Sequence, residues 1–248
     1  MSMFEDTIQK RHAVRYNDGN VEEFEDSVVV EDVITLYLNG TKYISMVATA
    51  DSLDELGAGF FIATGIAKKI KSVRAEGLNV YVEADEISPV SGILESAGGF
   101  SGAKDTKSSL VSAGDVCITP EEIFEIRESL NADVWSRTGG LHSTVLYHQH
   151  KMAAIFCDIG RHNTVDKAIG YMTLHGLSPK DCVIGCTGRQ PVGMVSKAVN
   201  AGLPLVVSRA AATTAGIDLA DKCGITLICF TRDRRFTVYT HPERVLMR

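Results

Sequence analysis

Hydrophobic positions divide the chain into a strand-rich first part and a later part in which strands alternate with helices. Residues 28–38 are rich in β-branched and aromatic side chains, and the turn-forming pair Asn39-Gly40 follows them. This pattern predicts a hairpin whose second strand covers residues 42–49. Further short strands are expected near Val73 and at residues 78–82.

Helices are predicted by apolar positions at helical spacing and by the residue types found at helix ends. Asp51 or Ser52 is placed to cap a helix that has one apolar side. The segment Thr119-Pro120-Glu121-Glu122 combines a capping threonine, a proline in the first turn and a glutamate that completes a capping box. Residues 1–27 are charged and are expected to form a loose arm. Residues 92–115, rich in Gly, Ser and Lys, are expected to form a mobile loop between two lobes.

After the middle of the chain, helices and strands follow one another at regular spacing. Predicted helices cover residues 164–174, 192–201 and 213–223, and predicted strands cover residues 181–185, 204–208 and 225–230. This alternation is typical of an α/β layered domain with a largely parallel or mixed sheet. Ligands of such sheets sit beyond the carboxyl ends of the strands. Three polar segments follow the predicted strands there: Thr187-Gly188-Arg189, Ser208-Arg209 and Thr231-Arg232.

Composition narrows the class of protein. The chain has 248 residues, a net charge of −6 and a pI near 5.7, which argues against a nucleic-acid partner or a basic membrane-surface protein. It contains no apolar run long enough to span a bilayer, and residues 1–18 lack the apolar core of a signal peptide. We therefore expect a cytoplasmic protein without a membrane partner.

Six cysteines are scattered along the chain without a CxxC pair, so we expect reduced core residues and no zinc site. They are Cys117, Cys157, Cys182, Cys186, Cys223 and Cys229.

The candidate chemistry concentrates in residues 136–167, where a short apolar segment separates two polar clusters. In the first, Thr138-Gly139-Gly140-Leu141-His142, the glycines let a ligand approach the main chain, and a helix starting near Leu141 would favour an anion. In the second, Arg161 offers a planar fork for phosphate and Lys167 a compact positive charge. A phosphate-bearing, nucleotide-like ligand fits these side chains.

Acidic residues of the second cluster leave two interpretations open. Asp158 and Asp166 can accept hydrogen bonds from a sugar hydroxyl or a guanine edge. Alternatively, Gly139-Gly140 is only a turn and the charges form a structural network, in which Asp166 pairs with Arg161 or Lys167.

Both clusters closely resemble the signature motifs of the formate dehydrogenase accessory protein (FdhD) family. Those motifs read TGGxH(A/S) and D(V/I)GRHNxxDKxIG. Residues 50–66 resemble the family pattern TPxDLEELxxGFLxxEGI, with Ala50 in place of the proline and Thr64 in place of the glutamate. Residues 187–198 resemble SGRxSxEMVxKA, and residues 230–244 resemble GFxRxxRxxxYTxPERI.

The resemblance implies an α/β (α+β overall) fold with two parts. Residues 1–115 would form a β-rich N-terminal lobe with a mobile Gly/Ser loop. Residues 116–248 would form a domain similar to the cytidine deaminase fold, without its zinc site.

Family members are described as sulfurtransferases, which implies a function for this chain as well. The protein would take sulfur from a cysteine desulfurase and deliver it to the molybdenum bis(guanine dinucleotide) cofactor, which is then inserted into formate dehydrogenase. GDP-like nucleotides would mimic that ligand, and a cytoplasmic homodimer is expected. Cofactor contacts are expected from Thr138, Gly139, Gly140, His142, Asp158, Arg161, His162, Asn163, Asp166, Lys167, Thr187, Gly188, Arg189, Phe230, Thr231, Arg232, Asp233, Arg234 and Arg235.

One departure from the family pattern changes the expected chemistry. The family's loop carries SCGxCG or GCGGG, but here Ala97 stands at the first cysteine position and Phe100 at the second. A persulfide needs a thiolate, so the catalytic residue is unknown and Cys117 is only a weak candidate. The alternative is a non-catalytic, cofactor-binding chaperone that has lost sulfur transfer.

A zinc-dependent deaminase is a third hypothesis, which rests on the fold alone. Such enzymes need H-x-E followed by P-C-x-x-C. The only H-x-E string is His241-Pro242-Glu243, near the end of the chain, and P-C-x-x-C does not occur.

Overall fold

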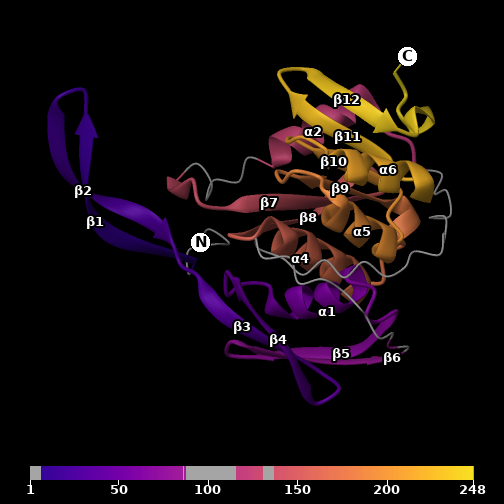
Figure 1. Ribbon diagram of the computed structural model, residues 1–248, viewed down its shortest axis with the longest axis horizontal. Helices are drawn as coiled ribbons and strands as arrows, with labels where there is room; N and C mark the ends of the chain where they lie inside the picture. The colour runs from indigo at the N-terminus through magenta and orange to yellow at the C-terminus, as the bar shows by residue number, and fades with distance from the viewer. Residues whose placement is uncertain (1–6, 86, 88–115, 131–136, 248) are drawn as a thin grey trace.

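The computed structural model describes residues 7–85, 87, 116–130 and 137–247 (Figure 1). The described residues form a mixed α/β protein with a two-stranded, a four-stranded and a six-stranded sheet, which confirms the predicted fold class. The predicted loop at residues 92–115, including Ala97, lies outside the described residues. The boundary predicted at residues 115 and 116 and the likeness to the deaminase fold stay predictions.

The first sheet is a hairpin that corrects the expectation of a loose arm at residues 1–27. Strands β1 (Ile8–Asn17) and β2 (Asn20–Val29) pair antiparallel along their whole length. The turn is Asp18-Gly19, and both residues have positive φ, at 47° and 88°. An Asp-Gly pair favours this tight turn, and oppositely charged side chains face each other across the strands. The sequence analysis identified strands by alternating apolar residues, whereas these two strands carry facing charged side chains instead.

The four-stranded sheet builds the first layer of the body and has strand order β4-β3-β6-β5. Its hairpin turn is Asn39-Gly40, as predicted. Ser52 precedes the following helix, as predicted. It has a φ of 49° and its side chain makes no capping hydrogen bond, so the predicted capping interaction is wrong. The elements are β3 (Asp32–Leu38), β4 (Thr41–Ala48), α1 (Leu53–Ala63), β5 (Lys69–Glu76) and β6 (Asn79–Asp85).

The six-stranded sheet has the order β12-β11-β10-β9-β7-β8 and is mixed. Strands β9, β10 and β11 are parallel, and β7 is antiparallel to both β8 and β9. The carboxyl ends of β8 to β11 and the start of β7 therefore meet at one edge, which we call the C-edge. The strands are β7 (His142–His148), β8 (Lys151–Asp158), β9 (Cys182–Cys186), β10 (Leu205–Ser208), β11 (Thr226–Arg232) and β12 (Arg235–Thr240).

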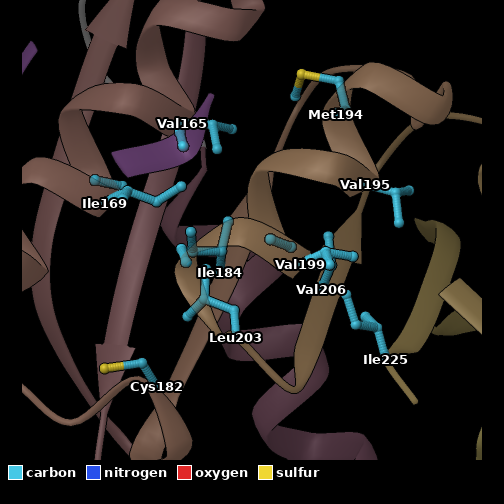
Figure 2. Close-up of a cluster of buried hydrophobic side chains, with 14 of the residues drawn as sticks. Val165, Ile169, Cys182, Ile184, Met194, Val195, Val199, Leu203, Val206 and Ile225 are labelled. Atoms are coloured by element: carbon cyan, nitrogen blue, oxygen red, sulfur yellow. The ribbon is translucent and has the colours of Figure 1, made fainter. Parts of the chain in front are cut away.

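Helices cover both faces of this sheet. On one face, side chains of α4, α5 and α6 pack with inward-facing residues of β7, β9, β10 and β11, and Figure 2 shows Ile184, Val199 and Val206 close together in this cluster. Ile123 and Ile126 of α2 cover the other face, and Thr119 and Glu122 form the predicted capping box. No helix in the described part of the chain is long and apolar enough to cross a membrane. The helices are α2 (Pro120–Ser129), α4 (Arg161–Leu174), α5 (Val192–Ala201) and α6 (Thr214–Cys223), with short 3-10 turns η2 (Pro179–Asp181) and η3 (Pro242–Arg244).

Helices α1 and α4 join the two larger sheets by a backbone-to-backbone contact. A Cβ at Gly59 would overlap the carbonyl oxygen of Asp166, and a Cβ at Gly170 would overlap the carbonyl oxygen of Glu55. The two glycines therefore let the helices approach more closely than side chains would allow. This contact brings the end of β4 next to the end of β8.

We expect Gly59→Ala to lower the free energy of unfolding by about 3 kcal/mol, because the backbone of α4 cannot move away from a new methyl group. Urea denaturation of both proteins measures this. Gly57→Ala in the same helix is the control: there the new atom meets the side chain of Val80 instead of backbone, and the loss should be smaller. An equal loss for both variants would contradict the proposed backbone contact.

Candidate functional site

A pocket of about 390 Å³ opens at the C-edge. The backbone of Gly139 has a φ of 64°, and no atom of the described residues lies within 4 Å of the position a Cβ would take, so the main chain there is open to a ligand. The condition of a helix that starts near Leu141 is not met, because β7 starts at His142 and its backbone pairs with β8. The lining residues are Gly139, Gly140, Leu141, His142, Ile159, Thr187, Arg209 and Ala210.

His142 and Thr187 form one polar wall of this pocket. The Nδ1 atom of His142 lies 3.1 Å from Thr187 Oγ1, which also accepts a hydrogen bond of 3.1 Å from the backbone N–H of Ser143. Burial lowers the pKa of His142, and the nearby cations Arg161 and Arg189 lower this pKa further. The imidazole is therefore neutral at pH 7 and can exchange hydrogen bonds with a bound group.

Two arginines beside this wall raise the local positive potential. Burial lowers the pKa of Arg161, and the like charge of Arg189 lowers it further, so the two guanidinium groups repel one another. Arg161 Nε is buried and has no hydrogen-bond partner among the described residues, whereas Arg189 is exposed. Gly188 leaves room for Arg161, since a Cβ there would lie 2.9 Å from the Cβ of Arg161. Arg161 also opens α4, whose free N–H groups favour an anion.

Behind the pocket, Lys167 and Asp158 form a buried ion pair with an N–O distance of 2.9 Å and no exposed side-chain surface. The Lys167 ammonium also bonds Thr49 Oγ1 at 2.9 Å and Asp51 Oδ1 at 2.9 Å. Asp158 accepts hydrogen bonds from the backbone N–H groups of Thr49 and Gly160. We call these five residues the Lys167 network. Their polar atoms meet one another inside the protein, so the expected phosphate contact of Lys167 and ligand contact of Asp158 have no support in this geometry.

Three further motif residues also lie inside the protein. Asp166 pairs with Lys197 at 2.6 Å, which corrects the expected pairing with Arg161 or Lys167. Asn163 donates hydrogen bonds to Val47 O and to an Asp158 carboxylate oxygen. His162 is 6% exposed, its Nδ1 has no partner among the described residues, and burial lowers its pKa to about 3.

The predicted residues of β11 and β12 lie at the same edge but outside this pocket. Phe230, Arg232 and Arg235 line a second hollow of about 240 Å³, and Thr231 is buried. Asp233 and Arg234 form the turn that follows, where Arg234 lies over the ring of Phe124 on α2. Because β10 separates β11 from β9, the two hollows are neighbours on the C-edge rather than one site.

Arg209, Ile159 and Ala210 line the pocket but were not among the predicted site residues. Arg209 follows β10 directly, so its position after a predicted strand was the signal that could have added it. Nothing in the sequence distinguished Ile159 and Ala210 from core residues.

All six cysteines are described. Five are buried, and burial raises the pKa of Cys157 to about 12 and that of Cys186 to about 11. Cys117 is half-buried and lies in a small cavity with Tyr147 and Asp181, at the end of the sheet opposite the C-edge. The seven residues of β7 separate it from the pocket by roughly 20 Å. In the described ranges no group of three or more His, Cys, Asp or Glu side chains is arranged to hold a metal.

We expect Lys167→Met to lower the free energy of unfolding by about 3–5 kcal/mol, because it leaves the carboxylate of Asp158 buried without a counter-charge. Chemical denaturation at neutral pH measures the loss. Lys71→Met is the matched control, since Lys71 pairs with Asp85 at the surface, where an ion pair contributes less than about 1 kcal/mol. A loss for Lys167→Met no larger than the control would show that the network does not hold the fold together.

Comparisons with known proteins agree with this architecture. The model of the FdhD/NarQ family matches residues 29–246. Proteins named sulfur carrier protein FdhD are similar over most of their length. The one from Bacillus subtilis (strain 168) is 31% identical over 95% of this chain and 96% of its own, and the one from Wolinella succinogenes is 32% identical over 91% and 85%.

A solved structure shares the fold. The crystal structure of a candidate formate dehydrogenase accessory protein from Desulfotalea psychrophila superposes with a TM-score of 0.81 at 25% identity, covering 97% of this chain and all of the other. With a family model that spans both larger sheets, and relatives that match along nearly the whole chain, this chain belongs to the FdhD/NarQ family.

Proposed function

We propose that the chain is an accessory protein of formate dehydrogenase maturation that binds the guanine-dinucleotide molybdenum cofactor at the C-edge. The observation that carries this proposal is the pair Arg161 and Arg189, two repelling cations beside a glycine-walled pocket. Such a pair is stabilised when an anion binds between its members. A pyrophosphate is an anion of the right charge.

The residues around the pocket fit a nucleotide. Gly139 and Gly140 expose main chain to which phosphate or base can approach, and His142 and Thr187 offer neutral hydrogen-bonding groups. A bis(dinucleotide) has two anionic dinucleotide halves, and the hollow of Arg232 and Arg235 provides a second cationic position along the same edge. We therefore assign one half to each hollow, and GDP serves as a mimic of one half.

The cysteines favour cofactor binding without sulfur carriage on the chain's own thiols. A thiol must be ionised and accessible to accept sulfur. No described thiol is accessible near the pocket, and Ala97 replaces the family's loop cysteine. Sulfur transfer through Cys117 is the second candidate, since Cys117 is the one cysteine that is not buried and the relatives are named sulfur carriers.

The partner that follows from this function is formate dehydrogenase, and a cysteine desulfurase is the partner of the second candidate, sulfur transfer through Cys117. The support for the first is the name of the solved structural relative, and for the second it is the name of the sulfur carrier relatives. The protein would act as a homodimer.

We expect the native chain to bind GDP and Arg189→Ala to weaken binding at least about ten-fold, because each charge-assisted hydrogen bond to phosphate contributes about 1.5–3 kcal/mol. Isothermal titration calorimetry at fixed salt measures the Kd. Arg74→Ala, which removes an exposed arginine on the four-stranded sheet, should leave the Kd unchanged. Equal affinity of native protein and Arg189→Ala would move the nucleotide away from this pocket.

We expect no reducible gain in mass when the chain is incubated with a cysteine desulfurase and cysteine, because no accessible thiol lies near the pocket. Intact-mass spectrometry with and without reductant checks this. A gain of one sulfur atom that disappears in Cys117→Ser would establish the second candidate. A gain that survives in Cys117→Ser would show that one of the buried cysteines becomes accessible.

A further inference from the structure

A groove of about 700 Å³ runs between α2 and the turn that joins β11 to β12. It lies on the face of the six-stranded sheet that α2 covers (Figure 1). Two aromatic rings belong to its wall, those of Phe124 and Tyr147, and the hydroxyl of Tyr147 lies 2.9 Å from Ser129 Oγ. We call this hollow the α2 groove. Its lining residues are Glu121, Phe124, Glu125, Arg127, Glu128, Ser129, Tyr147, Asp233 and Arg234.

The α2 groove carries an excess of negative charge. Four carboxylates and two guanidinium groups line it, so two negative charges are not balanced within the groove. Arg127 pairs with Glu128. Glu121, Glu125 and Asp233 are exposed and form no ion pair with any described residue. A concave surface lined by one dominant sign of charge concentrates the field there and attracts groups of the opposite charge.

The spacing of the glutamates fits an extended polypeptide. Glu121, Glu125 and Glu128 are separated by four and three residues, so they lie on one side of α2. The ten residues of α2 extend over about 15 Å, the length of roughly five residues of an extended chain. Glu121 and Glu125 are about 6 Å apart along the helix axis. Alternate side chains of an extended strand are separated by nearly the same distance, about 6.6 Å.

The groove already holds one arginine of the chain itself. The guanidinium of Arg234 lies over the ring of Phe124, 5.4 Å from its centre. This contact shows that a planar cation can be placed on an aromatic wall of the groove, among its carboxylates. A guanidinium stacks on aromatic rings and forms forked hydrogen bonds with carboxylates, which makes arginine better suited than lysine to such a surface.

We propose that the α2 groove docks an extended, arginine-bearing segment of the enzyme that receives the cofactor. The turn Asp233-Arg234 forms one side of the groove, and the next residue, Arg235, lines the second hollow of the C-edge together with Phe230. An enzyme held in the groove is therefore next to the hollow to which we assign half of the cofactor. The identity of the partner rests on the proposed function, whereas the chemistry of its segment rests on the groove.

A variant that neutralises the glutamates of the groove tests the proposal on the full chain. It combines Glu121→Gln, Glu125→Gln and Glu128→Gln, which keep good helix-forming residues in α2. Biolayer interferometry at fixed salt measures the Kd for formate dehydrogenase purified without its cofactor. We expect this Kd to rise at least about ten-fold, because three carboxylates that attract the partner's arginines are lost. Added salt should weaken the native complex more than that of the variant.

The control removes the same charge elsewhere. Glu31→Gln, Glu83→Gln and Asp218→Asn neutralise three exposed carboxylates outside the groove and should leave the Kd for the enzyme unchanged. As a second probe, an acetylated peptide of alternating glycine and arginine should compete with the enzyme. The same peptide with citrulline, which has a similar shape without the charge, should not.

Further measurements on the same samples separate this inference from the others. Circular dichroism verifies folding, and the Kd for GDP should be unchanged in the groove variant. A native chain that does not bind the enzyme, equal binding by native and groove variant, or an equal loss in the control would each overturn the proposal. If sedimentation velocity showed that the groove variant loses self-association, the groove would bind a second copy, and the proposal would also be wrong.

Discussion

A fully buried lysine holds together the two larger sheets of this protein. Taking an ammonium group and a carboxylate out of water is costly, and the cost is offset only when close partners surround both charges. Lys167 has such partners from two distant parts of the chain: Thr49 and Asp51 follow β4, and Asp158 ends β8. The close contact of α1 with α4 at Gly59 and Gly170 places these groups within reach. The ion pairs and the glycines therefore depend on each other.

This arrangement separates the roles of the two signature motifs. The glycine-rich motif lies at the surface and forms the pocket wall with Gly139, Gly140 and His142. The second motif is mostly internal: Asp158 accepts the N–H of Gly160, which precedes α4, and Lys167 lies about two turns further along the helix. Arg161 of that motif lies close enough to Arg189 for the like charge to lower its pKa. The internal residues thus fix the start of α4 and with it the position of Arg161.

Much of the fold was predictable from the sequence because the signals were local. The Asn39-Gly40 hairpin, the capping box at Thr119 and the alternating elements after residue 160 depend on neighbouring residues. The β1–β2 hairpin was missed because its pairing uses facing charges rather than alternating apolar residues. The partners of Lys167 and Asp166 were missed for a different reason. Their partners, Thr49 and Lys197, are 118 and 31 residues away, and spacing along the chain says nothing about such contacts.

The sequence predicted which edge of the sheet carries the site, but not which of its side chains are exposed there and which are buried. Polar segments that follow parallel strands meet at one edge of a sheet, and this rule placed Thr187 at the edge where Gly139 and Gly140 also line the pocket. It cannot tell which side chains of a motif turn outward, because a charged residue at an edge is equally useful as a ligand or as half of a buried pair. The thiols were predicted better. The sequence analysis expects core cysteines, and five of the six are buried, where burial raises the pKa of their thiols and keeps them neutral. Sulfur chemistry at the pocket would therefore need a thiol from outside this chain, or a movement that carries Cys117 around the sheet.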